Sequence, residues 1–238
     1  MLIHTNTIEA IQVKAIMKIC HQYLKMKGKI MKQKILSKIK ENGLVAVVRG
    51  TDDINAVEIS EKIIEGGIKT IELTFSTRYA DNAINKLSRK YHDDENILIG
   101  AGTVLDDITA RIAILNGAQF VVSPHFDKNI SKVCNRYSIP YLAGCGSVTE
   151  VISAIENGSD IVKIFPGGVL GSSFIKDVHG PIPYANMMPS GGVNIDNMDK
   201  WINAGAYAIG IGSALTKGGI DKIVDTTKAF VEKYNGIK

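Results

Sequence analysis

The chain has 238 residues, 45% of them hydrophobic and 22% charged, which is enough to bury one sizeable core in a single globular unit. No run of eighteen apolar residues occurs, so we expect no helix that spans a membrane. The net charge of +4 belongs to residues 1–30, where five lysines face the single acid Glu9, and the neutral remainder has no basic stripe of the kind that binds nucleic acid.

Residues 1–30 are expected to be a leader that is disordered or forms a helical extension. They lack the continuous apolar stretch of a secretory signal, and their lack of arginine and low serine content argue against a transit peptide. Met31, which opens the segment MKQKILSKIKENGLVAVVRG, is our candidate for the natural start. The N-terminal mass of protein made from the native gene would decide this.

From residue 31 onward the chain repeats one theme, a short apolar run rich in Val and Ile, then Gly or Ser, then a stretch with helical periodicity. In AVEISEKIIEGG, for example, the apolar residues form a stripe and the paired glycines mark a helix end. The predicted strands cover residues 44–48, 70–75, 97–102, 119–123, 140–144, 160–165, 186–191 and 206–212.

Eight such units with nearly continuous apolar strands predict an α/β fold, a (β/α)8 TIM barrel that forms a single domain over residues 31–238. An open, doubly wound sheet is the alternative. In a barrel the active site lies where the C-terminal ends of the strands meet. The residues predicted near that end are Arg49, Glu72, Thr103, Pro124, His125, Lys163 and Ser213.

Lys163 lies in the middle of the apolar segment DIVKIF. A lysine there points either into the core, where its charge is costly, or into a site that uses it as a nucleophile on a carbonyl substrate. Glu72 in TIELTF shares one strand face with Thr74 and needs a partner inside a barrel. The pair could be a buried salt bridge of limited value, or a nucleophile with its proton shuttle, and the two residues together favour catalysis.

Glycine-rich turns follow the last two predicted strands, and they contain Gly191, Gly192 and Ser213. Such turns let backbone N–H groups approach a phosphate, so we predict a phosphate cradle rather than simple tight turns. His125 is expected to be a hydrogen-bonded loop residue.

The three cysteines, Cys20, Cys134 and Cys145, form no CxxC pattern, so no disulfide framework is expected and the reducing cytoplasm is the predicted location. The histidines show no spacing typical of metal ligands, and no metal or cofactor is predicted.

The runs VAVVRG, TIELTF, IGAGTV, VVSPHF, DIVKIFPG and MPSGGV resemble those of the 2-keto-3-deoxy-6-phosphogluconate aldolase family, also called 4-hydroxy-2-oxoglutarate aldolase. The resemblance covers about residues 32–220. It implies a class I aldolase that works without a metal, usually as a homotrimer, in the Entner–Doudoroff pathway of carbohydrate metabolism.

By this resemblance Lys163 would form the Schiff base with the substrate or with pyruvate, and Glu72 would be the general acid and base. Thr103 would bind the pyruvyl carboxylate, and Pro124 and Phe165 would wall the pocket. Gly191, Gly192 and Ser213 would hold the distal phosphate. The products would be pyruvate and glyceraldehyde 3-phosphate.

The chain departs from the family at Ser76, where many members have an arginine that grips the substrate carboxylate. Arg78 or Arg49 could take over that role, Arg49 also being a candidate for the phosphate. The substrate therefore remains open between the gluconate phosphate, its galactonate epimer and 4-hydroxy-2-oxoglutarate. A metal-dependent decarboxylase is disfavoured because the DxKxxD pattern is absent, and a non-catalytic sugar-phosphate sensor would not need Lys163 and Glu72.

Overall fold

The computed structural model describes residues 31–237, so the predicted leader lies outside the described residues. Eight strands alternate with helices along the chain, as the sequence predicted. Each falls within or next to its expected range. The strands are β1 (Leu44–Val48), β2 (Thr70–Thr74), β3 (Leu98–Gly102), β4 (Val121–Val122), β5 (Tyr141–Cys145), β6 (Ile161–Ile164), β7 (Met187–Pro189) and β8 (Ile209–Ile211).

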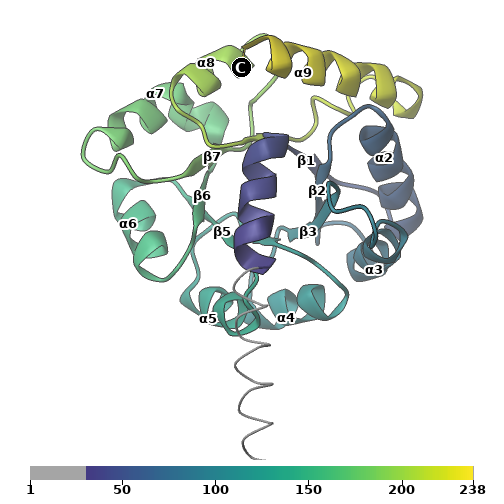
Figure 1. Cartoon of the computed structure of the whole chain (residues 1–238), viewed down its shortest axis with the longest axis horizontal. Coiled ribbons are helices and arrows are strands. Elements are labelled where there is room, and N and C mark those ends of the chain that lie inside the picture. Colours follow the sequence, from purple (N-terminus) through teal and green to yellow (C-terminus); the bar gives the residue numbers. More distant parts are fainter. Residues whose placement is uncertain (1–30, 238) are drawn as a thin grey trace, which may run out of the picture.

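The strands form one parallel sheet in the order β7-β6-β5-β4-β3-β2-β1-β8. A single parallel bridge between Ser190 and Gly210 joins the two end strands. The sheet thus curls into a nearly closed barrel with an outer ring of helices, visible end-on in Figure 1. This confirms the (β/α)8 barrel and rejects the open sheet.

The outer helices begin where short polar side chains cap their free N–H groups. The Asp52 and Asp106 side chains accept from Asn55 N and Thr109 N, and Ser147 caps in the same way. The helices are α2 (Asp53–Glu65), α3 (Ala80–Lys90), α4 (Asp107–Leu115), α5 (Lys128–Tyr137), α6 (Val148–Glu156), α7 (Gly167–His179), α8 (Met198–Asn203), the 3-10 turn η1 (Ile220–Lys222) and α9 (Ile223–Ile237).

A further helix, over residues 31–42, precedes the barrel and was not among the predicted elements. Figure 1 shows it lying across the end of the strand ring. Its apolar face, formed by Ile35, Leu36 and Ile39, packs against side chains that fill the barrel interior, including Leu98 and Ile161 at the starts of their strands. The helix therefore closes the N-terminal end of the barrel.

Polar contacts hold this helix in place. Lys32 forms a 2.6 Å ion pair with Asp160, just before β6. The Tyr207 hydroxyl donates to the Leu36 carbonyl at 3.3 Å. With one end covered in this way, the opposite end, where the strands finish, is the one that remains for a site. No helix among residues 31–237 combines the length and apolar character needed to cross a membrane.

Candidate active site

Lys163 and Glu72 lie inside the barrel on strands that are four positions apart in the ring of eight. The distance from Lys163 Nζ to Glu72 Oε1 is 3.3 Å, and both residues are buried, at 5% and 0% exposure. The strands oppose each other across the interior, so residues 91 positions apart in sequence meet. The structure thus brings together the two residues that the sequence singled out.

The Glu72 carboxylate fits because β3 has no side chain beside it. A Cβ on Gly102 would lie 2.1 Å from Glu72 Oε1, which is too close for any real atom. The other oxygen, Oε2, is buried and has no hydrogen-bond partner in the described part of the chain. A buried acceptor without a partner is costly, and here it leaves one carboxylate oxygen free to bind a substrate or water.

Phe165 follows Lys163 by two residues at the end of β6, and Pro124 lies in the loop after β4. The Lys163 amine lies 5.6 Å from the centre of the half-buried Phe165 ring. On β5, Gly144 pairs with Lys163, and a Cβ there would lie 2.3 Å from the Pro124 carbonyl oxygen. The missing side chain lets the loop after β4 pack against Gly144, the β5 residue that pairs with Lys163.

A buried hydroxyl network fixes that loop. The Tyr141 hydroxyl lies 2.6 Å from Ser123 Oγ, donates to the His125 carbonyl at 3.1 Å and accepts from the Asp127 N–H at 3.2 Å. Ser123 Oγ also contacts the His125 carbonyl, and its one proton serves either this carbonyl or the Tyr141 hydroxyl. Burial raises the pKa of Tyr141 above its ordinary 10.0, so the hydroxyl stays protonated as a donor. The expected hydrogen bond of the His125 ring is absent among the described residues, and its side chain is exposed.

The glycine turns lie together at the mouth of the barrel. Gly191 and Gly192 have φ values of 85° and 78°, and a Cβ on Gly192 would lie 2.7 Å from Gly168 Cα. Gly167 N donates to the Ser190 carbonyl at 2.9 Å, which ties the loops after β6 and β7 to each other. Exposed backbone of this kind suits an anion.

Arg49 and Ser213 border the same region. A Cβ on Gly212 would lie 3.3 Å from Arg49 Nη1, so the guanidinium at the end of β1 rests against the turn after β8. Arg49 and Ser213 are both exposed, and no ion pair to another described residue engages Arg49. A free cation beside glycine turns is an arrangement that can bind a phosphate.

The remaining predicted residues lie at the ends of β2 and β3. Ser76 Oγ is 2.9 Å from Thr74 Oγ1 and is exposed at the mouth. Arg78 is exposed and is not held by an ion pair with any described residue, so the structure does not bring it to the lysine. Thr103 is half-buried and has a φ of 54°, an uncommon conformation for a residue with a branched side chain.

The supporting residues of this site were not predicted from the sequence. Thr77 Oγ1 accepts from Gly50 N at 3.0 Å and joins the loops after β1 and β2. The Tyr141 network and the need for Gly102 were also missed. A glycine in an apolar strand signals a close approach, but not by which partner.

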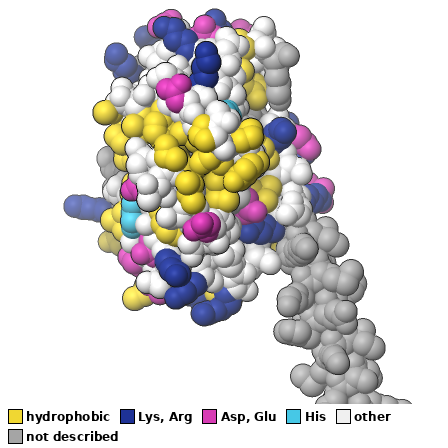
Figure 2. Space-filling view, turned by 90° about the vertical axis from the view of Figure 1, so that its left-hand side faces the viewer, with side chains coloured by type: hydrophobic (Ala, Val, Ile, Leu, Met, Phe, Trp, Pro, Cys, Tyr) yellow, Lys and Arg dark blue, Asp and Glu magenta, His cyan; other side chains and the backbone are white. Residues whose placement is uncertain are grey.

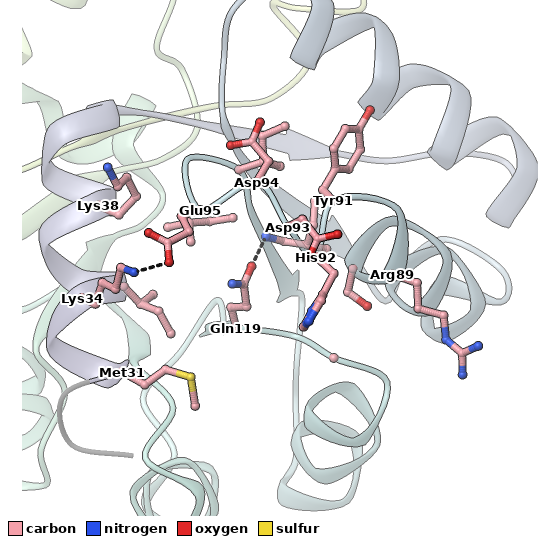
Figure 3. A pocket seen from close by; sticks show the side chains of 16 residues that line it. Met31, Lys34, Lys38, Arg89, Tyr91, His92, Asp93, Asp94, Glu95 and Gln119 are labelled. Atoms are coloured by element: carbon pink, nitrogen blue, oxygen red, sulfur yellow. Dashed lines mark hydrogen bonds and ion pairs between the residues drawn. The ribbon is translucent and has the colours of Figure 1, made fainter. Parts of the chain in front are cut away.

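A cavity of about 720 Å³ lies at the other end of the barrel, between the helix of residues 31–42 and the loop after α3 (Figure 3). Within its lining Lys34 pairs with Glu95, and Gln119 accepts from Ile99 N. It holds no lysine buried like Lys163, so we place the chemistry at the mouth. Over residues 31–237, no three His, Cys, Asp or Glu side chains gather as a metal site would require.

Comparison with known proteins gives a consistent set of relatives. The family model described as "KDPG and KHG aldolase" matches residues 35–230. The chain is 29% identical to the 2-dehydro-3-deoxy-6-phosphogalactonate aldolase of Escherichia coli, over 80% of this chain and 94% of that protein. It is 35% identical to the 2-dehydro-3-deoxy-phosphogluconate aldolase of Treponema pallidum, over 62% of this chain and 70% of that protein.

Solved structures agree with these matches. A native KDPGal structure superposes with a TM-score of 0.76 at 28% identity, covering 82% of this chain and 95% of the other. A KDPG aldolase from Legionella pneumophila, with pyruvate captured as a covalent carbinolamine intermediate, superposes with a TM-score of 0.74 at 25% identity, covering 82% and 96%. A designed cage built by fusing symmetric oligomeric domains also matches, with a TM-score of 0.77 at 28% identity over 82% of this chain and 73% of that chain.

Proposed function

Because this chain belongs to the KDPG and KHG aldolase family, whose members are class I pyruvate aldolases that act through a Schiff base, we propose that it cleaves 2-keto-3-deoxy-6-phosphogluconate reversibly to pyruvate and glyceraldehyde 3-phosphate. One observation carries the proposal, the buried pair in which Lys163 Nζ lies 3.3 Å from Glu72 Oε1. The amine can form an imine with the carbonyl group of a substrate, and the carboxylate is close enough to transfer the protons that this reaction requires.

The reaction begins when Lys163, as the free amine, attacks the 2-oxo group and water leaves to give an iminium. The iminium withdraws electrons from the C3–C4 bond. Glu72 takes the proton of the C4 hydroxyl, directly or through a water, and that bond breaks to release the aldehyde. The enamine of pyruvate that remains is protonated at C3, and hydrolysis of the imine releases pyruvate and restores the amine.

The other residues of the mouth supply binding. Thr103 takes the pyruvyl carboxylate, and Pro124 and Phe165 exclude water from the imine. Gly191, Gly192 and Ser213 hold the phosphate, and Arg49 joins them. The position of Arg49 against Gly212 supports this last assignment. Arg78 is a weaker candidate because nothing in the described chain directs it inward.

Trapping of the imine tests the lysine chemistry. Incubation with pyruvate and sodium borohydride, with a chelator present, is expected to add a reduced pyruvyl group at Lys163 that mass spectrometry of peptides locates. Lys163→Arg is expected to abolish the adduct, whereas Lys86→Arg, at an exposed lysine of α3, keeps it. An unmodified Lys163 in the wild-type protein would reject the proposed function.

Comparison of kcat/KM between substrates tests which sugar acid the enzyme prefers. We expect the highest kcat/KM for the gluconate phosphate, lower values for its galactonate epimer, and lower values still for 4-hydroxy-2-oxoglutarate. A higher kcat/KM for the galactonate phosphate would reassign the natural substrate while leaving the lysine mechanism intact. We also propose that the enzyme works in the cytoplasm, which suits its free, buried Cys134 and Cys145.

We further propose that the chain assembles as a homotrimer through two apolar faces of the barrel. Figure 2 shows apolar side chains gathered on the side to which α6 belongs. There Val148 and Ile152 are 43% and 42% exposed, and Val169 at the start of α7 is 83% exposed. On α4 and just before it, a second exposed stripe at helical spacing contains Leu105, Ile108, Ile112 and Leu115.

Two different patches on one subunit are what a ring needs, because each interface in a ring joins unlike surfaces. Light scattering is expected to give three times the 25.8 kDa chain mass for the wild type. A lysine placed at the 40% exposed Ile112 should lower that mass, whereas Ile54→Lys, at a 72% exposed position on α2, should not. A monomeric wild type would reject the trimer.

A further inference from the structure

We propose that Ser76 presents only hydrogen-bond acceptors to the mouth of the barrel, and that it thereby selects substrates with a hydroxyl on the aldehyde portion. This inference rests on the proposed function and concerns the specificity of the same site. It assigns a role to the residue that stands where an arginine was expected.

The direction of the hydrogen bonds follows from counting protons. Thr74 Oγ1 lies 2.9 Å from the Val48 carbonyl oxygen, and a carbonyl can only accept. Thr74 has one hydroxyl proton, which this contact uses. In the 2.9 Å contact between Thr74 Oγ1 and Ser76 Oγ, either atom could donate by geometry alone. With the Thr74 proton engaged, Ser76 must be the donor.

Burial keeps this arrangement in place. Thr74 is fully buried in β2, and its contact with Val48 joins neighbouring strands, so its hydroxyl has no water as an alternative acceptor. Ser76 is exposed just beyond the end of β2, and while its proton is directed at Thr74 its oxygen offers lone pairs alone to a ligand. A hydroxyl can donate to such an oxygen, whereas a carboxylate or phosphate oxygen, itself an acceptor, is repelled.

The consequence concerns the choice between aldehydes. Glyceraldehyde 3-phosphate carries a hydroxylated carbon beside its carbonyl, where glyoxylate carries a carboxylate. The cation near the mouth, Arg49, lies against Gly212 after β8 and so serves the phosphate end. Ser76 therefore favours hydroxylated sugar-acid phosphates over 4-hydroxy-2-oxoglutarate, whose cleavage gives glyoxylate.

The test measures kcat/KM for addition of pyruvate to glyceraldehyde 3-phosphate and to 3-oxopropyl phosphate, which lacks only that hydroxyl. Ser76→Ala should lower the ratio of the two values about three- to tenfold, the effect of one neutral hydrogen bond. Ser76→Thr keeps a hydroxyl and should keep the ratio near that of the wild type. An equal ratio in the wild type and Ser76→Ala would overturn the proposal.

A second variant tests the direction of the proton. Thr74→Val removes the acceptor that engages the Ser76 proton, so Ser76 becomes free to donate to an anion. The kcat/KM for glyoxylate relative to 3-oxopropyl phosphate should then rise, and a fall or no change would contradict the acceptor-only assignment. Borohydride trapping with pyruvate is run on each variant, because it needs no aldehyde. Normal trapping with unchanged ratios rejects the role of Ser76 alone, whereas lost trapping in the wild type rejects the proposed function and this inference with it.

Discussion

At the scale of single residues, the site depends on the absence of side chains as much as on their presence. The Glu72 carboxylate occupies space that any residue larger than glycine at position 102 would take. Gly144 likewise makes room for the loop that carries Pro124. The identity of the neighbours thus decides whether the carboxylate can stand beside Lys163.

Gly102→Ala is expected to displace the Glu72 side chain, because the new Cβ would lie 2.1 Å from Oε1 and 2.5 Å from Cγ. Overpacking of this kind costs about 1–3 kcal/mol of the free energy of unfolding. We also expect kcat to fall at least about tenfold, since one tenfold step corresponds to about 1.4 kcal/mol in the barrier. Urea denaturation and steady-state assays measure the two effects.

Gly236→Ala is the matched control. Nothing lies within 4 Å of a Cβ at that position, which is in α9. Alanine exceeds glycine in helix propensity by up to about 1 kcal/mol, so the control should keep kcat and should not lose stability. Equal kcat values for the wild type and Gly102→Ala would contradict the packing argument.

At the scale of elements, the eight strands were predictable because each carries its own local signal, a short and largely apolar run followed by a turn. The helix of residues 31–42 was not predicted to close the N-terminal end of the barrel, since that role depends on an opening formed by all eight strands. Loop positions were also beyond prediction, because Tyr141 fixes the loop after β4 from a different strand.

Ile39→Ala tests whether the helix of residues 31–42 stabilises the barrel by closing its N-terminal end. Ile39 is fully buried against the interior cluster of the barrel, and deletion of such a side chain costs about 2–5 kcal/mol of the free energy of unfolding. Lys34→Ala, on the same helix, breaks a pair whose side chains are 55% and 72% exposed and should cost about 0.5 kcal/mol or less. Urea denaturation compares the two, and equal losses would show that the helix does not close the barrel.

Tyr141→Phe tests the loop after β4. The change removes the donor to the His125 carbonyl and the acceptor for the Asp127 N–H, and we expect a loss of about 1–2 kcal/mol of the free energy of unfolding. Because the same loop carries Pro124, the KM for the sugar phosphate should rise. Tyr184→Phe, at a 73% exposed position, should change neither quantity. An unaltered KM in Tyr141→Phe would separate the network from substrate binding.

At the scale of the whole molecule, the buried hydroxyl and thiols link the fold to pH. Burial raises the pKa of Cys134 and of Cys145 from an ordinary 9.0 to about 12, and it raises that of Tyr141 above 10.0. The folded chain therefore keeps protons that the unfolded chain releases. This contribution to stability is complete below about pH 9 and is lost as the pH rises toward 12.

Urea midpoints measured at pH 8 and pH 10 should show lower stability at pH 10. In the folded protein at pH 8, a thiol reagent should leave Cys134 and Cys145 unmodified, and it should react with them once urea unfolds the chain. A midpoint that stays level or rises between the two pH values would contradict the linkage.

The sequence by itself determined the repeating units, the barrel, and the two residues with the strongest chemical signal, Lys163 and Glu72, because these depend on local periodicity and on residue type. The tertiary structure decided what those residues meet. Closure of the barrel placed β2 opposite β6 and set Arg49 against Gly212, and the pairing of β1 with β2 directed the Thr74 hydroxyl at the Val48 carbonyl. Such contacts join positions far apart in the chain, and their geometry follows from packing across the whole barrel, which no local pattern encodes.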